Sequence, residues 1–210
     1  MIESQCGIAW SRHRNRKSIY EDWRSYENGE FLLRPVQTED AGELLKVYSD
    51  QEARKLFNVD NFPSPCFFDT LEQMRAELKY YHREYENKGF VRWSVTDKKT
   101  GEVFGTVENF HRKAMDEVTG KPRDAFHDTA ILRVDIRSDY EREPVLSSLI
   151  LLILETAYED FECVRIATKA PKAAAERRRA LAKAGFTETE DPLIGHKGQK
   201  YGDYFIRERS

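Results

Sequence analysis

The chain contains three consecutive segments that decide its fold: AILRVDI at residues 130–136, PVLSSLILLILETAYED at 144–160 and VRIAT at 164–168. The first and third are short apolar runs typical of strands, and the middle one is long enough for a buried helix. A strand, a helix and a second strand in this order form a right-handed crossover with parallel strands. We therefore predict a parallel pair near Val134 and Ile166.

The other elements follow outward from this unit by the same periodicities. Further strands are expected at 31–36, 90–96 and 103–110, from 186 onward, and at 201–207, and helices at 41–48, 71–85 and 172–183. The short connection 97–101 predicts an antiparallel hairpin, so the sheet is mixed. We predict an α/β fold with a central mixed sheet of about six to seven strands flanked by helices. Gly185 is expected to end the last helix in a left-handed conformation.

The length of 210 residues and the 40% apolar content fit one domain with its own core. We assign residues 29–210 to this single domain and 1–28 to an N-terminal arm. The arm lacks periodicity but carries aromatic side chains, among them Tyr20, Trp23 and Tyr26. We favour an arm packed on the domain by these aromatics, and the alternative is a partner-binding tail.

Charge and cysteine usage exclude several classes of protein. The net charge of −3 does not suit a nucleic-acid binder, which needs a basic excess. The cysteines Cys6, Cys66 and Cys163 are odd in number and far apart, so we expect free thiols in a reducing compartment and no metal site. Basic residues at 12–17 do not fit the apolar core of a signal peptide, and the apolar stretch 145–154 is too short to span a bilayer. We expect a cytoplasmic protein without membrane association.

Four short strings accompany this order of elements: LRP at 33–35, EDA at 39–41, GTVE at 105–108 and LAKAGF at 181–186. Together with the order, they resemble the GNAT superfamily of acyl-CoA-dependent N-acyltransferases. NVDN at 58–61 and GHKG at 195–198 resemble its RimL-like bacterial members. The resemblance covers residues 30–208. It implies transfer of an acetyl group from acetyl-CoA to a primary amine, on a small molecule or a peptide, by direct attack. It also implies parallel strands that diverge at one end, and frequent homodimers.

The loop that binds the cofactor's pyrophosphate in this family departs from the family pattern. Such loops offer small residues and backbone N–H groups at a helix N-terminus. Here, in residues 137–146, Arg142 and Pro144 stand where glycines are expected, and Leu146 where a small residue is expected. Pro144 also removes one N–H donor. Among the late-helix positions, Ala174 replaces an Asn that contacts the cofactor, and Leu181 replaces a Tyr that protonates the leaving thiolate.

We therefore expect cofactor contacts from other residues. The candidates are Val134 and Ile136 on the strand, Arg142 and Val145 at the following helix, and Arg177 on the late helix. Helical spacing places Arg177 on the inner face, where it can hold a phosphate. The alternative is a solvated helix face with pairing near Glu176.

Two carboxylates are candidates for the general base that takes the amine's proton. Glu108 stands late in its strand, and burial would raise its pKa toward useful values. The alternative is a Glu108 that faces solvent or pairs with Arg133. Asp135 is the second candidate, and its alternative is a salt bridge with Arg92 or Arg133.

Candidate acceptor contacts come from Asp60, Asn61 and His111. Asp60 and Asn61 suit an ammonium group but also suit ordinary turns. His111 can relay a proton, or simply cap its strand. The two functions to be separated are an N-acetyltransferase and a non-catalytic GNAT-fold module that binds a ligand or a protein.

Overall fold

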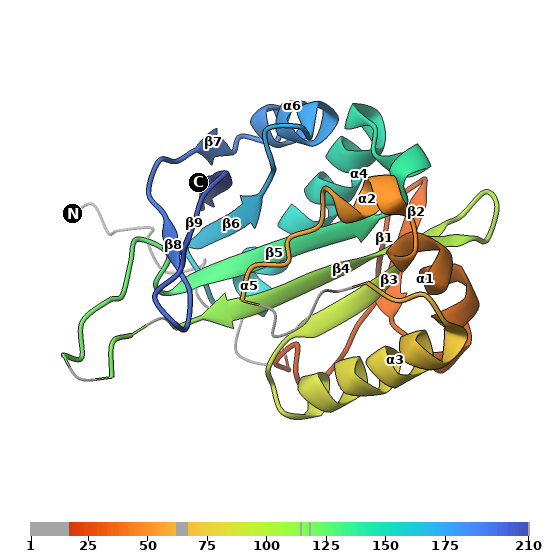
Figure 1. The fold of residues 1–210 in the computed structure, drawn as a ribbon, viewed down its shortest axis with the longest axis horizontal. Helices are drawn as coiled ribbons and strands as arrows, with labels where there is room; N and C mark the ends of the chain where they lie inside the picture. Colours follow the sequence, from red (N-terminus) through yellow and green to blue (C-terminus); the bar gives the residue numbers. More distant parts are fainter. Residues whose placement is uncertain (1–16, 62–66, 114, 118, 210) are drawn as a thin grey trace, which may run out of the picture.

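The computed structural model describes residues 17–61, 67–113, 115–117 and 119–209, arranged around one eight-stranded sheet (Figure 1). In spatial order the strands are β1 (Tyr26–Glu27), β2 (Phe31–Pro35), β3 (Val91–Asp97), β4 (Val103–Arg112), β5 (Thr129–Ile136), β6 (Arg165–Lys169), β10 (Tyr204–Glu208) and β7 (Thr187–Glu188). A separate hairpin pairs β8 (Leu193–Ile194) with β9 (Lys200–Tyr201). The predicted mixed sheet is confirmed, with eight strands rather than six to seven. The expected strand at 201–207 is divided between β9 and β10.

The strands β5 and β6 form the parallel pair of the sheet, and the described neighbours of this pair are antiparallel. Their pairing runs from Ala130 and Ile166 to Leu132 and Thr168. Beyond that point β5 continues to Ile136 while its pairing with β6 has ended. The predicted parallel pair that diverges at one end is confirmed.

Helices cover both faces of the sheet (Figure 1). One face carries α1 (Ala41–Tyr48), α2 (Gln51–Arg54) and α3 (Leu71–Glu86), and the other carries α4 (Glu143–Leu154), α5 (Ala157–Asp160) and α6 (Ala175–Lys183). Short 3-10 turns precede α1 at Thr38–Asp40 and α4 at Ser138–Tyr140. The expected helix over 144–160 is interrupted, because Thr156 leaves the helical conformation between α4 and α5.

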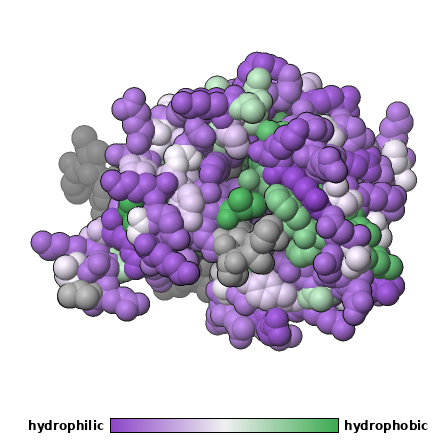
Figure 2. Space-filling model, viewed as in Figure 1, coloured by the Kyte–Doolittle hydropathy of each residue, from purple (hydrophilic) through white to green (hydrophobic). Residues whose placement is uncertain are grey.

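Two apolar layers result from this arrangement. The larger one packs α4 and α6 on the sheet, with Val107, Leu132 and Ile150 at 0 to 1% exposure. The smaller one packs α1 and α3 on the opposite face. The surface seen in Figure 2 is largely hydrophilic, apart from hydrophobic side chains gathered near its centre. Within the described ranges, no helix is both long and apolar enough to span a membrane.

The described part of the arm, residues 17–28, packs on the domain. Ile19 is fully buried, and the ring of Trp23 stacks on Tyr85 with centroids 4.1 Å apart. The Nε1–H of Trp93 donates to the carbonyl of Arg24 at 2.8 Å. Residues 1–16 lie outside the described ranges, as do Cys6 and Cys66, whereas Cys163 is a buried free thiol.

Candidate active site

Backbone donors of β5 point into the gap between β5 and β6. The N–H of Arg137 donates to the carbonyl of Phe104 at 2.9 Å, on the side of β5 that faces β4. Backbone groups alternate in an antiparallel ladder, so Val134 and Ile136 direct their N–H groups to the opposite side, toward the gap. These are the two strand positions where the sequence predicts cofactor contacts.

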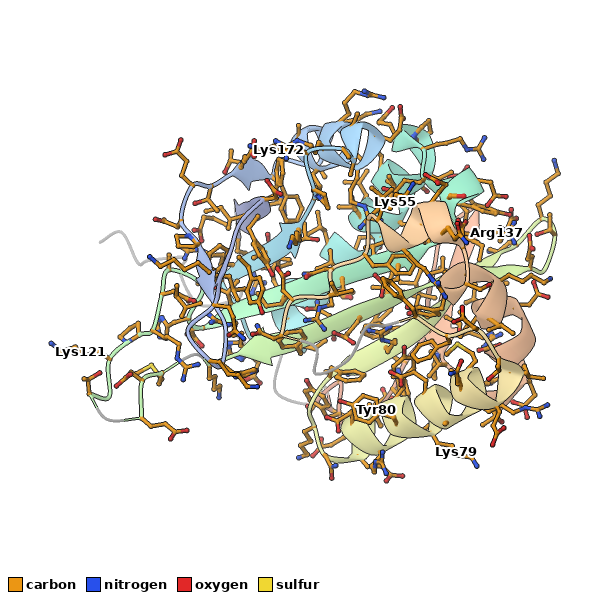
Figure 3. The ribbon with its side chains drawn as sticks, in the orientation of Figure 1. Lys55, Lys79, Tyr80, Lys121, Arg137 and Lys172 are labelled. Atoms are coloured by element: carbon orange, nitrogen blue, oxygen red, sulfur yellow. The ribbon has the colours of Figure 1, made fainter. Side chains whose placement is uncertain are left out.

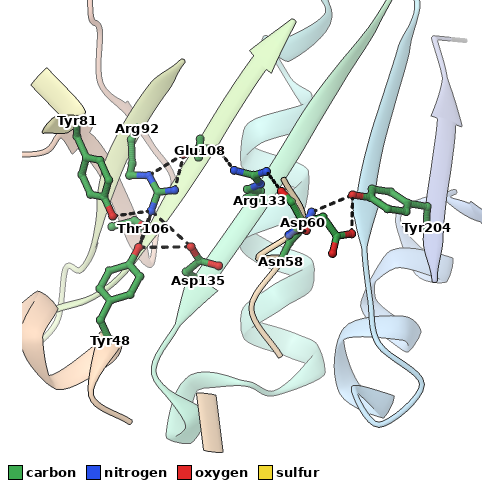
Figure 4. A network of polar contacts seen from close by, with 10 residues as sticks. All are labelled: Tyr48, Asn58, Asp60, Tyr81, Arg92, Thr106, Glu108, Arg133, Asp135 and Tyr204. Carbon is green, nitrogen blue, oxygen red and sulfur yellow. Dashed lines mark hydrogen bonds and ion pairs between the residues drawn. The ribbon is translucent and has the colours of Figure 1, made fainter. Parts of the chain in front are cut away.

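A buried polar network covers one face of β3, β4 and β5 (Figure 4). Arg92, Glu108 and Arg133 are direct cross-strand partners, so their side chains leave the sheet on the same face. Arg92 Nε lies 3.0 Å from Glu108 Oε2, and Arg133 Nη1 lies 2.8 Å from Glu108 Oε1. Arg92 also donates to the hydroxyls of Tyr48 at 2.5 Å and Tyr81 at 3.1 Å.

Glu108 is held between two guanidinium groups. Burial acts to raise the pKa of this carboxyl, but the charges and hydrogen bonds of Arg92 and Arg133 lower it below its ordinary value. The expectation of a raised pKa is therefore wrong, because the sequence does not reveal that both oxygens have cationic partners. The alternative, pairing with Arg133, is what the structure contains. An ionised carboxylate with both oxygens occupied is poorly suited to accept a proton.

Asp135 differs from Glu108 in the direction of its pKa shift and in the pairing of its oxygens. Burial raises the pKa of its carboxyl, Arg92 lowers it, and the nearby charge of Glu108 raises it further, for a net increase. Its Oδ2 has two long contacts, with Tyr48 at 3.4 Å and Arg92 at 3.5 Å. Its Oδ1 is buried without a hydrogen-bond partner among the described residues. The alternative for Asp135, an ion pair with Arg92, is present at 3.5 Å, but it engages Oδ2 and not Oδ1.

Asp60 holds a primary ammonium group of the protein itself. Its carboxylate accepts from Lys169 Nζ at 2.8 and 2.9 Å. It also accepts from the Tyr204 hydroxyl at 3.1 Å (Figure 4). Its carbonyl accepts from Arg133 at 2.9 Å, which fastens the segment after α2 to β5. The neighbouring Asn61 has a left-handed φ of 66° and accepts from the N–H of His196 at 3.2 Å.

A cavity of about 440 Å³ opens beside this network, between the end of α3 and the β8–β9 hairpin. Its lining includes Glu108 and Arg133 from the sheet and also Asn61 and His111. The Nε2 of His111 lies 2.8 Å from Asp128 Oδ1, an ion pair when the ring is protonated. The cavity thus unites most of the predicted acceptor residues with Glu108. No group of three potential metal ligands occurs in the described segments.

The loop after β5 is held by carboxylates of the protein. Arg137, labelled in Figure 3, pairs with Glu102 at 2.5 Å and with Asp139 at 2.6 Å. Arg142 is exposed and precedes α4 without a side-chain cap, while Val145 is half-buried in the first turn of that helix. The structure thus places both predicted residues at the N-terminus of α4.

Arg177 lies on the inner face of α6, as its helical spacing predicts, and is 4% exposed. Its Nε and Nη2 each lie 2.8 Å from an oxygen of Glu141, and its Nη1 donates to the carbonyl of Leu56 at 3.3 Å. The alternative of a solvated face is wrong for this residue, because the turn before α4 covers it.

Sequence reasoning did not identify Tyr48, Lys169 or Tyr204 as parts of the site. Tyr48 has the spacing of a core residue, and the other two lie in short strands. A signal was present in the alternation of polar side chains along otherwise apolar strands, such as Arg133 and Asp135. That period of two marks one polar face of a sheet but does not identify its partners.

The sequence matches the family model described as "Acetyltransferase (GNAT) domain" over residues 30–187, which is more than half of the chain. A curated relative, "Uncharacterized N-acetyltransferase YoaA" of Bacillus subtilis (strain 168), is 25% identical over 89 residues. That alignment covers 42% of this chain and 46% of the relative, so the match spans about half of the relative's length.

Solved structures with low identity share the fold. The ribosomal-protein-S5-alanine acetyltransferase from Vibrio fischeri has a TM-score of 0.61 at 15% identity, covering 89% of this chain and 97% of its own. The microcin C7 self-immunity acetyltransferase MccE, solved with acetyl-CoA and AMP, has a TM-score of 0.60 at 14% identity, covering 86% and 93%. With the family match and the diverging β5–β6 pair, these likenesses lead to one conclusion: the chain belongs to the GNAT acetyltransferase family.

Proposed function

We propose that this protein transfers an acetyl group from acetyl-CoA to a primary amine, by direct attack of the amine on the thioester. The observation that carries the proposal is the gap between β5 and β6, with the backbone N–H of Val134 directed toward it. Backbone donors fixed in a buried gap stabilise the oxyanion that develops on a thioester carbonyl. The amine nitrogen then forms the new amide bond as the carbon–sulfur bond breaks and the coenzyme leaves as a thiolate.

Asp135 is the residue best suited to accept the proton of the attacking amine. Its raised pKa supports this role, as does its Oδ1, which accepts no hydrogen bond from the part of the chain that the structure describes. Glu108 supports the role of Asp135 in a different way, since its negative charge raises the pKa of the Asp135 carboxyl. In this proposal Glu108 acts as a positioning residue that holds Arg92 and Arg133.

The acceptor enters through the 440 Å³ cavity, whose volume suits a small molecule or the end of a peptide. The carboxylate of Asp60 already binds one primary ammonium group, that of Lys169, which supports its predicted affinity for an amine. His111 and Asn61 line the same cavity and are proposed to contact the body of the acceptor.

A non-catalytic binding module is the second candidate. The observation that favours it is the loop before α4, where Glu141 and Asp139 supply negative charge at a position that an anionic pyrophosphate would need. A polar network can be retained in a fold that has lost its reaction, since fold does not decide function.

The release of free thiol separates the two candidates. The purified protein is incubated with acetyl-CoA and a panel of primary amines and peptide N-termini, and CoA thiol is measured against time. Acceptor-dependent release is the expected result. Acetyl-CoA binding by calorimetry without release for any acceptor would favour the binding module.

A further inference from the structure

The first N–H group of α4 is already bonded to an anion. Glu143 begins this helix, and its N–H donates to Oε2 of Glu176 on α6 at 2.8 Å. The N-terminus of a helix attracts negative charge, and a phosphate would use the same donor. The next residue, Pro144, has no N–H to offer. The other oxygen of Glu176 pairs with Arg179.

A buried cation beside the turn that leads into this helix, Arg177, also has an anionic partner. Arg177 donates two hydrogen bonds of 2.8 Å to the carboxylate of Glu141. The side chain of Arg177 is 4% exposed and that of Glu141 is 8% exposed. A guanidinium group binds phosphate in the same forked manner in which it binds a carboxylate. Glu141 therefore takes the place on Arg177 that a phosphate group would take.

The space between β5, β6, α4 and α6 is closed as well. The cavity there measures about 10 Å³, which is room for one water molecule at most. Its walls include Val134, Leu146, Thr168 and Arg177. The gap between the strands is thus covered on the side of α4, and the Arg177–Glu141 pair forms part of the cover.

We infer that Glu141 and Glu176 replace the phosphates of acetyl-CoA in the free protein and hold the groove between α4 and α6 closed. The inference rests on the proposed function, because the ligand that they exclude is its acyl donor. Acetyl-CoA then binds the conformation in which both carboxylates have moved away, and its apparent affinity is reduced by the fraction of that conformation. The device regulates access to the site without changing the residues that line the gap.

Calorimetric titration with acetyl-CoA tests this inference in wild type, Glu176→Ala and Glu155→Ala. Glu176 lies at the surface of α6, so its removal frees the Glu143 N–H without opening the core. We expect the Kd of Glu176→Ala to fall at least about tenfold, equivalent to about 1.4 kcal/mol. Glu155 is exposed at the other end of α4, so Glu155→Ala removes the same charge away from the groove. The acetyl-CoA Kd of this variant is expected to match that of wild type.

S-acetylpantetheine, which lacks phosphate groups, provides the second arm. Its affinity is expected to be the same in wild type and Glu176→Ala. Equal tightening for both ligands, or for both glutamate variants, would overturn the inference, as would an unchanged acetyl-CoA Kd in Glu176→Ala. If wild type releases thiol but the acetyl-CoA Kd of Glu176→Ala is unchanged, the inference fails and the proposed function is retained. Absence of acetyl-CoA binding and thiol release in every variant would overturn both proposals.

Discussion

Two buried carboxylates on neighbouring strands, Glu108 and Asp135, have opposite shifts in pKa. The difference comes from the number of cations each one contacts. Glu108 has a guanidinium on each oxygen, while Asp135 shares a single distant one at 3.5 Å. For Glu108 the cationic partners lower the pKa by more than burial raises it, and for Asp135 burial has the larger effect. The same network thus contains a carboxylate with both oxygens paired, Glu108, and one whose Oδ1 has no hydrogen-bond partner among the described residues, Asp135.

Replacing Asp135 by Asn tests its role as the base. We expect kcat to fall by about 100-fold or more, with an unchanged acetyl-CoA Kd, since the amide cannot accept the proton. Because the pKa of Asp135 is raised, the wild-type rate should increase with pH through that raised value, and Asp135→Asn should lose this limb. Asp191→Asn, an exposed substitution of the same kind, is the control. A variant with wild-type kcat would assign the proton to another acceptor.

Glu108→Gln is expected to act first on stability. It leaves Arg92 and Arg133 buried beside a neutral amide, and breaking such a pair costs about 3–5 kcal/mol. The depressed pKa of Glu108 means that its stabilisation is present at neutral pH and lost as the pH falls through the folded-state value. Urea unfolding of the variant and wild type should therefore differ most near neutral pH and converge in acid. A constant difference at all pH values would contradict this account.

The sequence predicts Glu108 as the first candidate and Asp135 as the second, and the proposed roles reverse this order. Residue type and strand position suffice to select both. Their pKa directions depend on Arg92 and Arg133, and on the face of the sheet that each side chain shares. That face is set by the cross-strand register, which is a property of the folded sheet.

At the scale of elements, Gly185 shows how one residue ends a helix. It follows α6 with a φ of 82°, as its position after the last periodic residue predicts. Gly185→Ala is expected to lower the free energy of unfolding by about 1 kcal/mol, because a Cβ is strained at this φ. Gly42→Ala, inside α1 where a Cβ meets no neighbour within 4 Å, is the matched control and should stabilise slightly. Both values come from urea unfolding, and equal effects would show that φ is not the cause.

The long elements are predictable and the shortest are not. The β5–α4–β6 unit follows from apolar runs that local sequence can reveal. The strands β1, β7, β8 and β9 have two residues each, which is too short for any period. They form because neighbouring strands present unpaired edges, as β10 does for Thr187 and Glu188. The closed loop before α4 is likewise a tertiary feature, since its partners include Glu102 before β4 and Arg177 on α6.

For the whole molecule, residues 17–28 connect the two layers around the edge of the sheet. Toward α3, the Tyr85 hydroxyl donates to the carbonyl of Ile19 at 3.1 Å. Toward α5, the Tyr26 hydroxyl donates to Asp160 at 2.5 Å. The segment thus contacts helices on opposite faces, and its β1 strand extends the sheet beside β2. We propose that it is part of the folded domain rather than a free tail.

Ile19→Ala tests this integration. Ile19 is fully buried in the larger apolar layer, although it precedes both β1 and β2 in the sequence. Truncating a buried isoleucine costs about 2–5 kcal/mol, through lost burial and the cavity that remains. We expect a loss in that range by urea unfolding, in a single transition. Val164→Ala removes apolar atoms from a side chain that is 66% exposed, and should change stability by less than about 0.5 kcal/mol. If Ile19→Ala were as mild as Val164→Ala, the segment would be a detachable arm, and the domain would have to be stable from residue 29 onward.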